Sequence, residues 1–119
     1  MSSAKPVAVY FSVREPESGE TPVVVEVPHA GLAVDPVSLA TLVAPARALG
    51  QDADLYVDDL YADAPGLGAT LITAHVSRYV CDLNRAEDDV DALTVEGSHG
   101  RSSPHGLVWR ATTENQPAI

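Results

Sequence analysis

Cysteine and basic residues are scarce in this sequence of 119 residues. Cys81 is the single cysteine, which excludes an intrachain disulfide and a zinc site built from several cysteines. Lys and Arg together number 7 against 17 Asp and Glu, which gives a net charge of −10. Because phosphate backbones and anionic lipids repel such a chain, we expect neither nucleic acid nor a membrane surface as a partner.

Long apolar runs are also lacking. No stretch approaches the roughly 20 apolar residues needed to span a bilayer, and the first residues, MSSAKPVAVYF, do not form a convincing secretory signal. We therefore expect a cytoplasmic protein. The sequence does contain 45% hydrophobic and 20% charged residues, which is typical of an ordinary globular domain, so we expect a single domain over 1–119.

Short β-branched runs alternate with helix-like segments, which predicts an α/β sheet. A strand over 7–13 is expected at a sheet edge and one over 23–27 inside the sheet, with further strands over 69–74, 78–83 and 106–112. Helices are expected over 36–49, with a break at Pro45, and over 55–62. Residues 86–105 are polar and are expected to form a long mobile loop.

Two segments hold candidate metal ligands. His29 follows the run VVVEV at the expected carboxyl end of a strand, where α/β proteins usually bind ligands. Asp52 and Asp54 carry hard oxygen ligands that zinc also accepts. Each has a structural alternative: His29 as a turn residue with a hydrogen bond, and the aspartates as caps of the helix that follows.

Two arginines lie seven residues apart in the segment SRYVCDLNR at 77–85. Arg78 lies next to an apolar strand, where an unpaired charge is costly. Guanidinium groups bind carboxylates in a bidentate manner and stabilise developing oxyanions. The alternative is that Arg78 and Arg85 form ion pairs with Asp82 and neighbouring aspartates.

Read together, five segments resemble the N-formylglutamate amidohydrolase family. They are VPHAG at 27–31, DADLYVDDLY at 52–61, LGATLITAHVSRYVCDLNR at 67–85, EDD at 87–89 and GLVWRATT at 106–113. The resemblance implies a zinc-dependent hydrolase that cleaves N-formyl-L-glutamate to formate and glutamate. It also implies a zinc-carboxypeptidase-like (phosphorylase/hydrolase-like) mixed α/β sheet flanked by helices.

The same resemblance implies roles for individual residues. His29 corresponds to the first zinc ligand and Asp54 to a carboxylate ligand, with Asp52 as its alternative. Carboxypeptidase-like enzymes place a glutamate three residues after that histidine, a position that Leu32 occupies here. Arg78 corresponds to the catalytic residue that polarises the scissile carbonyl, and Asn84 and Arg85 to the residues that bind the substrate carboxylate.

The family's chains are roughly twice as long, and their later half supplies a third zinc ligand and the general base. We therefore expect this chain to correspond to the N-terminal half, with an incomplete fold and little hydrolase activity alone. An unpaired sheet edge would then favour self-association. The alternative function is a non-catalytic domain that binds a small carboxylate through Arg78, Asn84 and Arg85.

Overall fold

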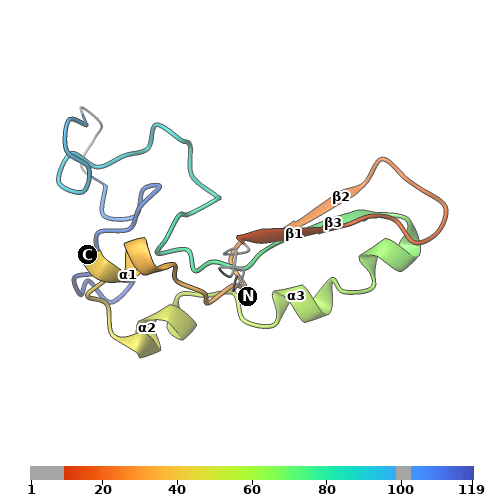
Figure 1. Ribbon diagram of the computed structural model, residues 1–119, viewed down its shortest axis with the longest axis horizontal. Coiled ribbons are helices and arrows are strands. Elements are labelled where there is room, and N and C mark those ends of the chain that lie inside the picture. The colour runs from red at the N-terminus through yellow and green to blue at the C-terminus, as the bar shows by residue number, and fades with distance from the viewer. Residues whose placement is uncertain (1–9, 99–102) are drawn as a thin grey trace, which may run out of the picture.

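The computed structural model describes residues 10–98 and 103–119. Three strands form a mixed sheet in the order β1-β3-β2 (Figure 1). β1 (Phe11–Arg14) pairs antiparallel with β3 (Thr70–Ala74), and β2 (Val24–Val27) pairs with β3 in parallel. The chain between β2 and β3 contains the helices, as a parallel connection requires.

Those helices are short. They are α1 (Pro36–Thr41), α2 (Ala46–Gln51), α3 (Val57–Leu60) and a 3-10 turn, η1 (Ala64–Leu67). The expected helix over 36–49 is therefore two helices, and the break falls before Pro45, as predicted, because proline lacks the N–H that a continuing helix needs. No helix in the described part of the chain is long and apolar enough to cross a membrane.

Several predicted elements are corrected. The strand at 23–27 is an edge strand, since β3 is the central one. Residues 78–83 form turns in place of a strand, because Asp82 draws Arg78 and the backbone of Asn84 into local hydrogen bonds. Residues 106–112 form isolated bridges only, His105 to Trp109 and Ala111 to Pro117. The first three residues of the predicted strand at 7–13 lie outside the described residues.

The loop predicted at 86–105 contains no helix or strand in its described part, 86–98 and 103–105. The buried carboxylate of Asp91 anchors it by accepting from the backbone of Leu93 at 2.8 Å and from Nε of Arg110 at 2.9 Å. The loop is therefore tied to the C-terminal segment.

A small core lies between α2 and the turns that follow β3. Tyr79 and Trp109 meet edge to face, with ring centroids 5.7 Å apart, and both are 3% exposed. Ala48 of α2 and Ala118 complete this cluster. The aromatic pair brings the segment 77–82 and the C-terminal segment together.

Candidate functional site

His29 lies two residues beyond β2 and is buried. Its position depends on Gly31, because a Cβ at Gly31 would lie 2.3 Å from the backbone carbon of His75. Only glycine permits this close approach of the two backbones. The carbonyl of His29 accepts the N–H of Asp54 at 2.8 Å, so the two candidate ligands are neighbours in space.

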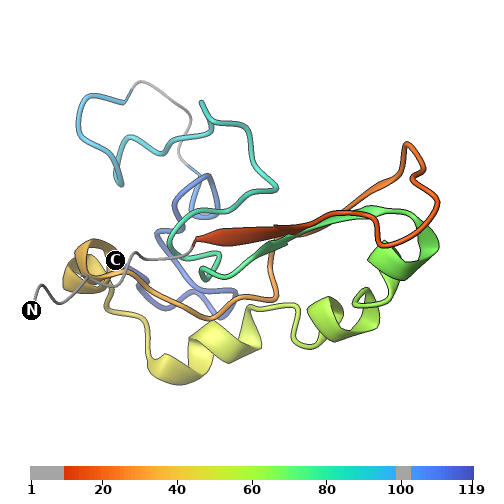
Figure 2. The same ribbon diagram turned by 45° about the vertical axis from the view of Figure 1, so that its right-hand side comes forward.

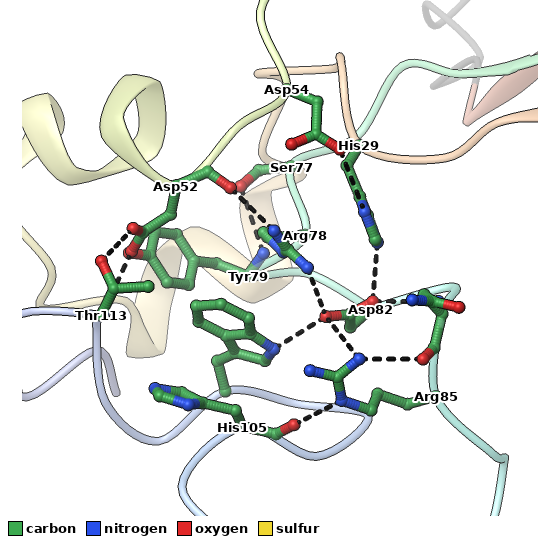
Figure 3. Close-up of polar contacts among 12 residues, drawn as sticks. His29, Asp52, Asp54, Ser77, Arg78, Tyr79, Asp82, Arg85, His105 and Thr113 are labelled. Atoms are coloured by element: carbon green, nitrogen blue, oxygen red, sulfur yellow. Dashed lines mark hydrogen bonds and ion pairs between the residues drawn. The ribbon is translucent and has the colours of Figure 1, made fainter.

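Asp82 is the centre of the polar network (Figure 3). Its side chain has no exposed surface. One carboxylate oxygen, Oδ1, lies 2.7 Å from Nε2 of His29 and accepts the backbone N–H of Asn84 at 2.9 Å. The other, Oδ2, accepts from Nε1 of Trp109 at 2.9 Å and from Arg78 at 3.1 Å.

These contacts determine where the protons lie on Asp82 and His29. Burial alone would raise the pKa of Asp82, but hydrogen bonds from Asn84, Arg78 and His29 outweigh it and hold that pKa below its usual value. Asp82 is therefore ionised near neutral pH and can only accept, so Nε2 of His29 carries a proton. In the neutral ring Nδ1 then bears the lone pair.

Nδ1 of His29 lies 3.6 Å from Oδ2 of Asp54, a carboxylate that is 55% exposed. The separation exceeds hydrogen-bond length. It is close to the distance between two ligand atoms of one tetrahedral zinc ion, which the usual Zn–N and Zn–O bond lengths set at about 3.4 Å. A metal-bound histidine also commonly donates its second N–H to a carboxylate, as His29 does to Asp82. The donor chemistry thus fits zinc.

Arg78 is held on three sides. Its Nη1 donates to the carbonyl of Asp52 at 3.1 Å, its Nη2 donates to Asp82, and its guanidinium carbon lies 4.5 Å from the centre of the Trp109 ring. The side chain is 17% exposed. A guanidinium fixed in this way keeps one N–H on each Nη for another acceptor.

Asn84 and Arg85 lie on the other side of Asp82. Nε of Arg85 donates to the carbonyl of His105 at 2.7 Å, and its Nη1 lies 3.9 Å from Asp82. Arg85 is 30% exposed and Asn84 is exposed. Both arginines therefore pair with Asp82, as the alternative interpretation of this segment predicted.

Asp52 has a different environment from Asp54. It is buried, and its carboxylate accepts from the hydroxyl of Tyr79 and from the hydroxyl and backbone N–H of Thr113 (Figure 3). Although burial works to raise the pKa of Asp52, the hydrogen bonds from Thr113 and Tyr79 lower it overall. Neither Asp52 nor Asp54 caps α3, which has Tyr56 at its N-terminus and no side-chain cap.

Comparison with known proteins now bears on this cluster. Residues 21–119 match the family described as N-formylglutamate amidohydrolase. The chain belongs to this family. It is 46% identical over 71 residues to an N-formylglutamate deformylase of Pseudomonas aeruginosa and 42% identical over 71 residues to one of Pseudomonas putida. Each alignment covers 60% of this chain and 26% of the relative.

The fold agrees with a solved amidohydrolase of the family. The crystal structure of N-formylglutamate amidohydrolase from Ralstonia eutropha JMP134 superposes with a TM-score of 0.79 and 25% sequence identity. The match covers 92% of this chain and 41% of that chain. This family member thus has a small mixed α/β fold that corresponds to less than half of the solved amidohydrolase.

The structure therefore brings the expected residues His29, Asp54, Arg78 and Arg85 around a residue that sequence reasoning treated only as an ion-pair partner, Asp82. The sequence did contain a signal for the role of Asp82, because this single acid of SRYVCDLNR lies four residues after one arginine and three before the next. Thr113 gave no such signal, because its contact with Asp52 spans 61 positions. Burial and the neighbouring carboxylate of Asp82 raise the pKa of the Cys81 thiol, which disfavours its reactive thiolate form.

Proposed function

We propose that this chain contributes a zinc-binding and oxyanion-stabilising site to an enzyme that hydrolyses N-formyl-L-glutamate to formate and glutamate. Membership of the family and the similarity to the two deformylases support the reaction class. Because the chain spans 26% of those relatives, the reaction of a whole enzyme is the subject of this proposal.

One observation carries it: His29 donates Nε2–H to buried Asp82 and directs Nδ1 toward Asp54 at 3.6 Å. We infer that Nδ1 of His29 and Oδ2 of Asp54 hold zinc. Asp52 fits less well, because both its oxygens already accept hydrogen bonds from Thr113, and one also from Tyr79. Zinc in such a site polarises an amide carbonyl and lowers the pKa of a bound water to about 7.

The other residues act by charge and position. Arg78 directs a fixed positive charge to the carbonyl oxygen on which negative charge develops during amide hydrolysis. Asn84 and Arg85 bind the substrate carboxylate, for which exposed amide and guanidinium donors are suited. The contacts with Asp82 and Trp109 fix Arg78 before substrate arrives, so it loses little freedom on binding.

Two ligands make a weak zinc site, since catalytic sites usually hold three protein ligands. Among the described residues no group of three His, Cys, Asp or Glu side chains is placed to hold a metal. We therefore expect the 119-residue chain to bind zinc weakly and to show little deformylase activity.

Zinc titration by calorimetry tests the proposal. We expect one site per chain with micromolar or weaker affinity, lost in His29→Ala and weakened at least tenfold in Asp54→Ala. The matched control is Asp58→Ala, which removes an exposed carboxylate from α3. Equal zinc affinity in the wild type and in His29→Ala would refute the site, as would strong hydrolysis of N-formylglutamate by the purified chain without zinc.

The second candidate function, a non-catalytic domain for a small carboxylate, is favoured by the guanidinium groups of Arg78 and Arg85, which are 17% and 30% exposed, beside exposed Asn84. The same calorimeter separates the two. Glutamate that binds equally well with and without a chelator, in His29→Ala as in the wild type, supports the binding domain; binding that requires zinc supports the hydrolase.

A further inference from the structure

Hydrogen bonds join the segment from His105 to Trp109 to the turns after β3. The carbonyl of His105 accepts from Nε of Arg85 at 2.7 Å. Asp82 accepts from Nε1 of Trp109 at 2.9 Å, and its backbone N–H donates to the carbonyl of Leu107 at 2.8 Å. In both views the C-terminal segment, drawn in blue, lies at the end of the sheet opposite the loop between β1 and β2 (Figures 1 and 2). The segment thus supports the part of the site that contains the arginines.

The ring of His105 packs on the indole of Trp109. The two ring centroids are 4.3 Å apart and the ring planes are inclined by 39°. The guanidinium carbon of Arg78 lies 4.5 Å from the centre of the same indole, and Figure 3 shows Arg78 and His105 apart from each other. Nε2 of His105 lies 3.3 Å from the carbonyl oxygen of Thr112, which can only accept, so Nε2 is the protonated nitrogen. The half-buried histidine ring is therefore held in place against the indole.

His105 reaches the two arginines through different atoms. Its main-chain carbonyl binds Arg85 directly, and its ring acts on Arg78 through Trp109. Both guanidinium groups approach one oxygen: Nη2 of Arg78 lies 3.1 Å and Nη1 of Arg85 lies 3.9 Å from Oδ2 of Asp82. Because like charges this close repel each other, contacts other than the shared carboxylate must fix their separation.

We propose that His105 is a positioning residue that fixes the guanidinium groups of Arg78 and Arg85 relative to each other. Its importance for the reaction rests on the proposed roles of the two arginines, but the positioning itself requires no zinc. In those roles Arg78 faces the carbonyl under attack and Arg85 binds the substrate carboxylate. The spacing of the two groups then has to match the substrate, and charges fixed in advance lose little freedom when it binds.

Three substitutions separate the properties of the His105 side chain. His105→Phe keeps a flat ring for the indole and loses the N–H that faces Thr112. His105→Gln keeps an N–H donor and loses the ring, and His105→Leu keeps a side chain of similar size without either. If stacking on Trp109 positions the arginines, the phenylalanine variant should behave like the wild type and the other two should not.

Solvent exchange of side-chain N–H groups, followed by NMR on the full 119-residue chain with a chelator present, measures the positioning. In His105→Leu and in His105→Gln we expect Nε–H of Arg85 to exchange at least about fivefold faster, as the loss of one hydrogen bond predicts. Nε1–H of Trp109, the single tryptophan of the sequence, should also exchange faster. Both rates should stay close to the wild-type values in His105→Phe.

Two controls separate a local effect from general loosening of the fold. His75→Leu replaces a histidine of similar exposure that follows β3 and should change neither exchange rate. The backbone N–H of Leu71 in β3 should keep its protection in every variant. Loss of that protection in His105→Gln and His105→Leu together would show that the histidine serves the whole fold, and would overturn the proposal.

Titration with L-glutamate, followed by the fluorescence of Trp109, distinguishes the positioning from the proposed function. We expect the affinity to fall at least about fivefold in His105→Leu and to return in His105→Phe. If the exchange rates change as expected while the wild type binds no glutamate, the positioning role stands and the assignment of Arg85 to the substrate carboxylate is contradicted. Unchanged exchange in His105→Leu, or equal rates in His105→Leu and His105→Phe, would overturn the positioning role.

Discussion

His29 and Asp82 are 53 positions apart in the sequence, yet Nε2 of His29 lies 2.7 Å from Oδ1 of Asp82 within a buried environment. The contact fixes the ring and leaves its Nδ1 facing Asp54. Because the same carboxylate also holds Arg78 and Trp109, one side chain orients both the candidate metal ligand and the candidate oxyanion-stabilising group.

Asp82→Asn tests this shared role. The NH2 group of asparagine would face either the N–H of His29 or the N–H groups of Trp109 and Arg78, so at least one hydrogen bond is lost. The buried positive charge of Arg78 also loses the carboxylate that balances it. We expect the free energy of unfolding to fall by about 3 kcal/mol and zinc affinity to fall by about 10- to 100-fold. Urea denaturation and calorimetry measure the two effects. Asp58→Asn, an exposed change on α3, should alter neither.

Gly31→Ala tests the backbone approach that positions His29. The new methyl group would lie 2.3 Å from the carbonyl carbon of His75, so the segments after β2 and β3 must separate. We expect a loss of about 1–3 kcal/mol in unfolding free energy and weaker zinc binding. Gly50→Ala is the matched control, because a Cβ there meets nothing within 4 Å and lies in α2. It should raise stability by about 0.5–1 kcal/mol. Equal effects of the two changes would contradict this account of Gly31.

Acid should unfold the chain through its buried aspartates. The folded pKa values of Asp52, Asp82 and Asp91 lie below the ordinary value of 3.8, so each group contributes stability that is complete above that value. This contribution is lost as the pH falls through the lowered folded values. Urea denaturation as a function of pH measures it. Asp52→Asn should be less stable at neutral pH and should lose less stability between pH 5 and pH 3 than the wild type; parallel profiles would exclude this role for Asp52.

Trp109→Phe separates the ring from the indole N–H. Phenylalanine keeps an aromatic face below Arg78, but the 2.9 Å hydrogen bond to Asp82 is lost. We expect a loss of about 1–3 kcal/mol for Trp109→Phe and about 3–5 kcal/mol for Trp109→Ala, which also leaves a cavity next to Tyr79. Chemical denaturation measures both. A Phe variant as unstable as the Ala variant would show that the ring contributes little.

Local sequence patterns predicted the elements whose formation depends on their own residues. The apolar run at 69–74 is the central strand, and Pro45 separates two helices. The segment 78–83 has strand-like Tyr79 and Val80, but hydrogen bonds of Asp82 with Arg78 and Asn84 turn it. The contacts that hold this carboxylate in place come from His29 and Trp109, which are distant in sequence and which the local pattern could not show. Sequence also could not show that Val24 is exposed and Val27 is buried, because both are valines and only their register on β3 tells them apart.

The carboxylate of Asp82 collects donors from residues 29, 78, 84 and 109, so the site depends on segments that leave the ribosome at very different times. Until Trp109 has been synthesised, one of these donors is missing and Tyr79 lacks its aromatic neighbour. We therefore expect the site to assemble late in translation. A nascent chain that ends before Trp109 should bind no zinc at the concentrations that saturate the released chain. Zinc binding by ribosome-stalled chains of increasing length would measure this order of events.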